Sequence, residues 1–182
     1  MYSVPRNSSR AAFVQAAALR VIQDAHLQVP PVPVEQLITD RGLAITGGKI
    51  PNGWGYFDAG AWVIRLSNAI LVDTAATRNR RRFTLAHELG HCVLEHGEQS
   101  CWNLSTIAEP SEVDELDDLP NFEQEAHMFA RELLLPREWF RRDWLDSPDA
   151  NRWSQIYGVS RETLFIVVTE RRLLMTRRKP HR

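Results

Sequence analysis

The sequence predicts an α+β fold that is mostly helical, with a small antiparallel sheet and a C-terminal tail of the helix-turn-helix type. Three observations support this prediction. Apolar residues recur at helical spacing on both sides of the chain's centre. Short β-rich segments separated by glycine turns are confined to residues 43–68. Near the end, NRWSQIYGVSRETLFIVV has the helix–glycine–serine–helix pattern of a helix-turn-helix.

Length and composition indicate an ordinary soluble protein. A chain of 182 residues suits one domain with a small appendage, and 43% hydrophobic and 25% charged residues are typical of globular proteins. The net charge of −1 gives no global field toward nucleic acid or membrane. No apolar run is long enough to span a bilayer, and two cysteines are no disulfide framework. We therefore expect a cytoplasmic protein with reduced thiols and no membrane partner.

The first half of the chain predicts two helices and then the sheet. A helix is expected over residues 8–26, with Ser8 or Ser9 as its cap, and a proline-rich segment then leads into a short helix ending at Gly42. The segments LAITGGKI, WGYFDA and AWVIRL follow, separated by Gly-Gly, Asn-Gly and Ala-Gly, which is typical of antiparallel strands. We expect AWVIRL to be an edge strand that receives an extended peptide by β-addition.

The second half predicts helices over about 74–97, 121–134 and 136–146, with the acidic stretch 98–120 as a mobile surface loop. In the tail, Gly158 is expected at the turn and Ser160 at the start of the next helix. That helix contains five consecutive apolar residues, 164–168, and a buried helix is poorly suited to reading base edges. Direct binding of nucleic acid is therefore less favoured.

The segment RRFTLAHELGHCVLEH, residues 81–96, has the spacing of a metal site. His87 and His91 lie one helical turn apart, so both imidazoles project from the same face. Zinc accepts neutral imidazole and leaves a coordination position for water, from which Glu88 could take a proton. Gly90 costs about 1 kcal/mol relative to alanine inside a helix. This cost indicates that another part of the chain approaches this face closely.

A third metal ligand is not evident within the same helix. His96 follows His91 by five residues, whereas the metzincin pattern requires a glycine at +3 and a histidine at +6. Position +3 is Leu94, so the metzincin class is excluded. The remaining option is a carboxylate from a second helix, as in sites with two histidines and one glutamate.

The helix predicted over 121–134 offers two carboxylates, Glu123 and Glu125. Its apolar stripe places Glu123 in the adjacent row, facing the interior, whereas Glu125 turns toward solvent. Glu123 is therefore the preferred ligand and Glu125 the alternative. His127 lies one turn after Glu123, and it either supports the ligands by a hydrogen bond or simply packs against them.

The segments RRFTLAHELGH and FEQEAHMFARELLLP together resemble the ImmA/IrrE family of zinc metallopeptidases. Weaker likeness extends to PPVPVEQLITDRGLAI, GYFDAGAWVIRLSN and YGVSRETLFIVVTERRLL, so it covers nearly the whole chain. The resemblance implies a zincin-like metallopeptidase domain over 1–146 and a small helical extension over 147–182 packed on it. It also implies His87, His91 and Glu123 as metal ligands and Glu88 as the base. His127 stands where the family usually has asparagine.

The same resemblance implies a zinc-dependent endopeptidase. Mn²⁺ and Fe²⁺ are alternative ions, because metal loading depends on availability as well as on affinity. Members of the family are often encoded beside a helix-turn-helix repressor of the Xre type, and the best-understood ones cleave it in response to stress or a mobile-element signal. We therefore expect a cytoplasmic protein substrate of this kind. The alternative function is a DNA-binding or protein-binding regulator that uses the C-terminal helices and keeps the metal for structure.

Overall fold

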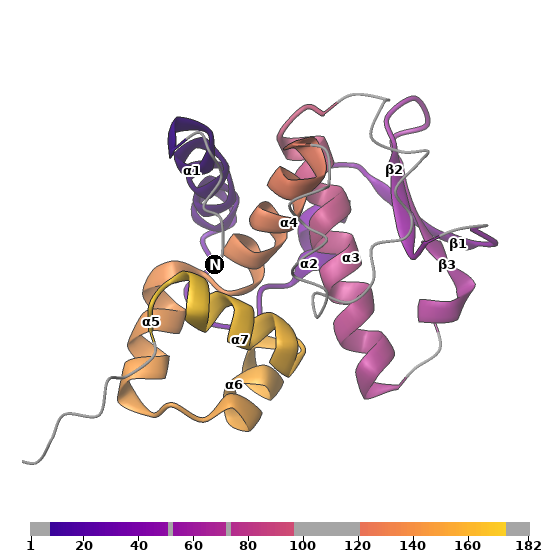
Figure 1. Ribbon diagram of the computed structural model, residues 1–182. Helices are drawn as coiled ribbons and strands as arrows, with labels where there is room; N and C mark the ends of the chain where they lie inside the picture. The colour runs from indigo at the N-terminus through magenta and orange to yellow at the C-terminus, as the bar shows by residue number, and fades with distance from the viewer. Residues whose placement is uncertain (1–7, 51–52, 72–73, 97–120, 174–182) are drawn as a thin grey trace, which may run out of the picture.

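The computed structural model describes residues 8–50, 53–71, 74–96 and 121–173, and the statements below concern these residues. The predicted α+β class with mostly helical content is confirmed (Figure 1). No helix in the described part of the chain is long and apolar enough to cross a membrane. The predicted loop 98–120 lies outside the described residues. The elements, in chain order, are α1 (Ser8–Asp24), α2 (Val34–Thr39), β1 (Ala44–Gly48), β2 (Gly55–Asp58), β3 (Val63–Ser67), a 3-10 turn (Asn68–Ile70), α3 (Ala75–Val93), α4 (Asn121–Leu134), α5 (Arg137–Asp146), α6 (Ala150–Tyr157) and α7 (Arg161–Glu170).

The sheet is mixed, which corrects the prediction of an antiparallel sheet. The strand order is β1-β3-β2, with β2 antiparallel and β1 parallel to β3. The sequence neighbours β1 and β2 do not pair, because the chain crosses from one side of β3 to the other between them. Ile64 therefore lies opposite both Ile45 and Phe57. The expectation that AWVIRL is an edge strand is wrong, since β3 is paired along both sides and cannot accept an added peptide.

Helices α3 and α4 form the centre of the molecule. Helix α3 starts at a reciprocal cap in which the Thr74 hydroxyl accepts from the Thr77 backbone and the Thr77 hydroxyl accepts from the Thr74 backbone. Figure 1 shows α4 lying between α1 and α3, with the sheet beyond α3. Strand β2 is the part of the sheet that packs most closely on α3. The residues that α3 and α4 direct toward each other are thus enclosed by structure on both sides.

The C-terminal helices have the predicted helix-turn-helix arrangement. Gly158 follows α6 with a φ of 64°, the left-handed region that favours glycine, and the Ser160 hydroxyl accepts from the Thr163 backbone at the start of α7. Arg82 of α3 donates to the Gly158 carbonyl at 3.1 Å and to the Val32 carbonyl at 3.0 Å. This arginine joins the turn and the segment before α2 to the central helix.

Residues 164–168 of α7 are mostly buried, as predicted, but Phe165 is 50% exposed. Successive residues of an α-helix are about 100° apart, so five consecutive side chains point all around the axis. One of them must face outward. The other four are buried, so the exposed face of α7 consists mainly of Arg161, Glu162, Phe165 and Glu170.

Candidate metal centre

Helix α3 brings the two predicted imidazoles together. The Nε2 atoms of His87 and His91 lie 3.0 Å apart, as the i to i+4 spacing requires. Both residues are buried, with 7% and 3% of their surfaces exposed. Buried imidazoles need polar partners, and the structure places one directly opposite them.

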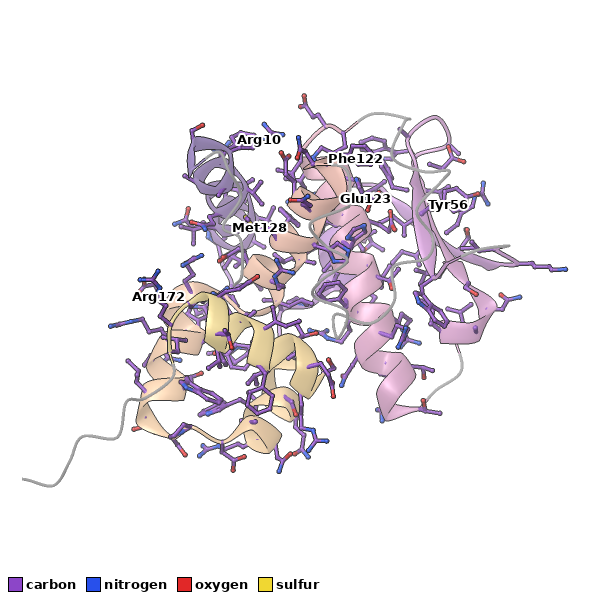
Figure 2. The ribbon with its side chains drawn as sticks, viewed as in Figure 1. Arg10, Tyr56, Phe122, Glu123, Met128 and Arg172 are labelled. Carbon is purple, nitrogen blue, oxygen red and sulfur yellow. The ribbon has the colours of Figure 1, made fainter. Side chains whose placement is uncertain are left out.

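Helix α4 supplies that partner through Glu123. Its Oε2 atom lies 3.0 Å from Nε2 of His87 and 3.6 Å from Nε2 of His91. Figure 2 shows Glu123 projecting from α4 toward α3. Burial by itself would raise the pKa of Glu123, but hydrogen bonds and charge from the two histidines outweigh this and hold that pKa far below its usual range. The helical phase read from the sequence thus places Glu123, and not Glu125, in the cluster.

The three donor atoms suit a divalent cation. His87, His91 and Glu123 are all buried, and one ligand atom of each lies within 4.8 Å of the other two. Donors around a tetrahedral zinc, at about 2.0–2.1 Å from the ion, are roughly 3.3 Å apart, which is close to the separations seen here. Each of these nitrogen atoms can offer a lone pair to a cation, and the carboxylate oxygen supplies negative charge beside them. A metal ion among them would satisfy all three donors and leave one position for water.

Gly90 allows α4 to approach this closely, which confirms that something packs against it. A Cβ atom at residue 90 would lie 3.3 Å from the backbone Cα of Ala126 and 3.0 Å from Cδ1 of Phe129. Both neighbours belong to α4, the helix that carries Glu123. The absence of a side chain at Gly90 therefore lets α4 place the carboxylate against the imidazoles, and the lower helix propensity of glycine is the cost of this close approach.

Replacing Gly90 by alanine should separate α3 from α4 and weaken metal binding. Overpacking a close contact typically costs about 1–3 kcal/mol, and because one neighbour here is the α4 backbone, we expect this cost to outweigh the roughly 1 kcal/mol gained in helix propensity. We expect lower stability in urea and a weaker affinity for zinc in a competition titration. Gly48→Ala is the matched control, because nothing lies within 4 Å of a Cβ atom there. A Gly90→Ala protein with undiminished stability and zinc affinity would contradict the assignment.

Glu88 lies beside the cluster but outside its donor set. Its side chain is buried, and the backbone of Phe57 in β2 donates a hydrogen bond to the carboxylate. Burial is the main cause that raises the pKa of Glu88 to about 7, partly offset by His91 and by the bond from Phe57, while Glu123 adds to the rise. A carboxyl with a pKa near neutrality can both take up and release a proton near pH 7.

The other two candidate residues have different surroundings from those expected. Glu125 does not turn toward solvent: its side chain is 16% exposed and is bonded by Arg10 and His96. The sequence misplaced it because α1 packs along that side of α4. His127 lies with its ring centroid 4.6 Å from that of His87, and within the described residues its Nε2 atom has no hydrogen-bond partner. The two rings are inclined at 59° to each other, and burial, first of several causes, lowers the pKa of His127.

Two further residues contact the candidate residues in ways that sequence reasoning did not find. His96 contacts His91, and Arg10 is bonded to Glu125. The usual signal for the position of His96 is missing, because Glu95, and not a glycine, takes the left-handed conformation that folds the chain back on the last turn. No sequence signal connects Arg10 with a residue 115 positions away.

Comparisons with known proteins bear on the family and the fold of the chain. The sequence model of the IrrE N-terminal-like domain, which defines the Peptidase M78 family, matches residues 54–166. That range contains all of α3 and α4. Among solved structures, the chain is similar to a Mycobacterium tuberculosis transcriptional regulator, with a TM-score of 0.60 and 18% identity. The likeness covers 96% of this chain and 60% of that one, and it concerns the fold. No curated protein sequence matches the chain.

Proposed function

The chain belongs to the Peptidase M78 (IrrE N-terminal-like) family, which confirms the resemblance seen in the sequence, and from this membership we propose that it is a metal-dependent endopeptidase. The observation that carries the proposal is the buried convergence of His87, His91 and Glu123 beside the carboxyl of Glu88. A metal site used only for structure would have no need of a further buried carboxyl beside its ligands.

In this mechanism His87, His91 and Glu123 hold the ion, and Zn²⁺ is the one that best suits the donor set. When bound, it supplies polarisation of the scissile carbonyl and acidification of water. Glu88 accepts the proton of the attacking water on its carboxylate and then delivers it to the leaving amine. The Phe57 backbone fixes the orientation of that carboxylate, and the surrounding helices exclude bulk water from it.

The proposed substrate is a protein, and specifically a cytoplasmic transcriptional repressor of the helix-turn-helix type. The family resemblance supports it, and the similarity in fold to a protein named as a transcriptional regulator fits a regulatory setting. This chain spans 60% of the length of that regulator, so nothing of its binding partners is carried over. Residues 147–182 are proposed as an extension packed on 1–146, in line with the bond from the Tyr157 hydroxyl to Asp143 at 2.7 Å.

A regulator that binds DNA through the C-terminal helices is the alternative function. The exposed side chains of α7 include Arg161, Glu162 and Phe165, which are not a basic surface. Binding to DNA depends largely on contacts of lysine and arginine with phosphates. The surface of α7 therefore favours the peptidase over the regulator.

Metal-dependent cleavage of a limited set of cytoplasmic proteins tests the proposal. The purified protein, loaded with Zn²⁺, Mn²⁺ or Fe²⁺, is incubated with lysate of its host cells, and new N-termini are mapped by mass spectrometry. We expect a few new termini that disappear with a chelator and return when metal is restored. If no terminus depends on metal with any of the three ions, the peptidase proposal is rejected. Metal-dependent cleavage only in proteins other than transcriptional regulators would reject the substrate class alone.

A further inference from the structure

The ring of His91 is held from both sides. Its Nε2 atom faces the donor cluster, and its Nδ1 atom lies 3.0 Å from Nδ1 of His96. A metal ligand must offer a lone pair, so with Nε2 toward the ion the hydrogen of the neutral ring resides on Nδ1. His91 therefore donates to His96.

His96 continues the series of hydrogen bonds, with each donor pointing away from the metal cluster. Since its Nδ1 atom accepts from His91, its own hydrogen resides on Nε2, which lies 3.1 Å from Oε2 of Glu125. One tautomer of each imidazole satisfies both hydrogen bonds. The chain from His91 through His96 to Glu125 thus has one consistent arrangement of neutral rings that ends on a carboxylate.

The end of α3 places His96 in this position. Glu95 adopts a φ of 57°, and the backbone N–H groups of His96 and Glu95 donate to the carbonyls of His91 and Cys92 at 3.1 Å and 3.3 Å. These are the two bonds of a Schellman motif, which commonly brings the side chains of its first and last residues together. A left-handed conformation costs a non-glycine residue roughly 1–2 kcal/mol, so the turn is maintained at a cost.

Helix α1 completes the chain through Arg10. Its guanidinium binds both carboxylate oxygens of Glu125, with Nε at 2.9 Å from Oε1 and Nη2 at 2.7 Å from Oε2. Paired bonds of this kind fix the orientation of a carboxylate as well as its charge. Figure 2 shows Arg10 on α1, near the end of α4 that carries Glu123. Side-chain exposure falls along the chain, from 43% at Arg10 to 16% at Glu125 and 5% at His96.

We infer that Arg10, Glu125 and His96 form a positioning relay that fixes the tautomer and orientation of His91 for metal binding. The relay makes α1 part of the metal centre, although Arg10 lies outside the residues matched by the family. The inference rests on the proposed function to the extent that His91 must bind a metal ion. Hydrogen-bond partners of ligating histidines typically contribute about 10- to 100-fold to metal affinity.

The test measures zinc affinity by competition with a chromophoric chelator, together with the visible spectrum of the Co²⁺ form. His96→Leu removes the acceptor for His91 and should weaken zinc binding about 10- to 100-fold and alter the Co²⁺ spectrum. Arg10→Gln acts further from the ion and should weaken binding about 3- to 10-fold. His96→Gln keeps an amide oxygen that can accept from His91, and should recover part of the affinity. Arg20→Gln, exposed on the same helix, is the control and should equal wild type.

The double variant separates a relay from two unrelated effects. If Arg10 acts through His96, Arg10→Gln should cause no further loss in the His96→Leu background, whereas independent sites would add. Wild-type affinity in His96→Leu, or an additive loss in the double variant, would overturn the relay. Should His96→Leu fail to fold, Arg10→Gln decides alone, and zinc affinity equal to wild type overturns the relay. Failure of the wild-type protein to bind zinc or cobalt would reject the proposed function as well.

Discussion

Replacing Glu88 by glutamine is expected to reduce peptide-bond cleavage about 10²- to 10⁴-fold while the protein still folds and binds zinc. Glutamine preserves the shape of the side chain, but it cannot accept the proton of the attacking water. The effect is measured as the initial rate of cleavage of the identified substrate by wild type and variant, together with the zinc content of these two enzymes. Glu162→Gln, exposed on α7, is the control and should keep wild-type activity. Undiminished cleavage by Glu88→Gln would exclude this residue as the base.

The same variant should change the dependence of stability on pH in the metal-free protein. The carboxyl of Glu88 has an ordinary pKa of 4.5 in the unfolded chain and one of about 7 in the fold. Between these values the unfolded state loses its proton first, so the wild type becomes less stable as pH rises from about 5 to 7 and loses no further stability from this group above that range. A neutral glutamine avoids this loss. Urea unfolding should show the stability advantage of Glu88→Gln increasing from pH 5 to pH 8, by up to about 3 kcal/mol.

In cells, Glu88→Gln separates the peptidase from the regulator. If the protein acts by cleaving a repressor, the variant should still bind the repressor but fail to relieve repression. If it acts by holding DNA through α6 and α7, the variant should behave as wild type, and truncation after Leu145 should abolish function. Cellular activity in the variant together with its loss on truncation would therefore reject the peptidase.

The donor cluster could be predicted from the sequence because each step depends on local geometry. The spacing of His87 and His91 is one helical turn, and the apolar stripe of the second helix distinguishes Glu123 from Glu125 by rotation about the axis alone. Gly90 indicated correctly that another segment packs on this face, because a glycine inside a helix costs stability and is expected where a neighbour requires the space. The caps of α6 and α7 were predictable in the same way, from Gly158 and Ser160.

The contacts that the sequence missed depend on how distant segments pack. The surroundings of Glu125 are decided by α1, which lies along α4 and brings Arg10 across 115 positions of sequence. The mixed sheet arises because β1 pairs with β3 and not with its sequence neighbour β2, and strand composition does not encode that choice of partner. His96 reaches His91 only because Glu95 takes a left-handed conformation without being glycine, so the usual signal of this helix end is missing.

Replacing Glu123 by glutamine should nearly abolish metal binding. The variant loses the anionic oxygen that lies 3.0 Å and 3.6 Å from the two imidazole nitrogens, and with it the charge that makes the cluster attractive to a divalent ion. We expect zinc affinity in a chelator competition to fall by more than about 100-fold, since changes that leave all three ligands in place already cost about 10- to 100-fold. Metal-dependent cleavage should disappear in parallel.

Glu125→Gln, two residues away on the same helix, is the matched comparison. Its amide oxygen can still accept from His96, so zinc affinity should fall by no more than about 10-fold. The variant with the larger loss of zinc affinity identifies the carboxylate that binds the ion, because both variants remove one charge from the same end of α4. A larger loss in Glu125→Gln than in Glu123→Gln would mean that Glu125 is the ligand. The relay from Arg10 would then end on the ion itself, and His96 would no longer serve His91.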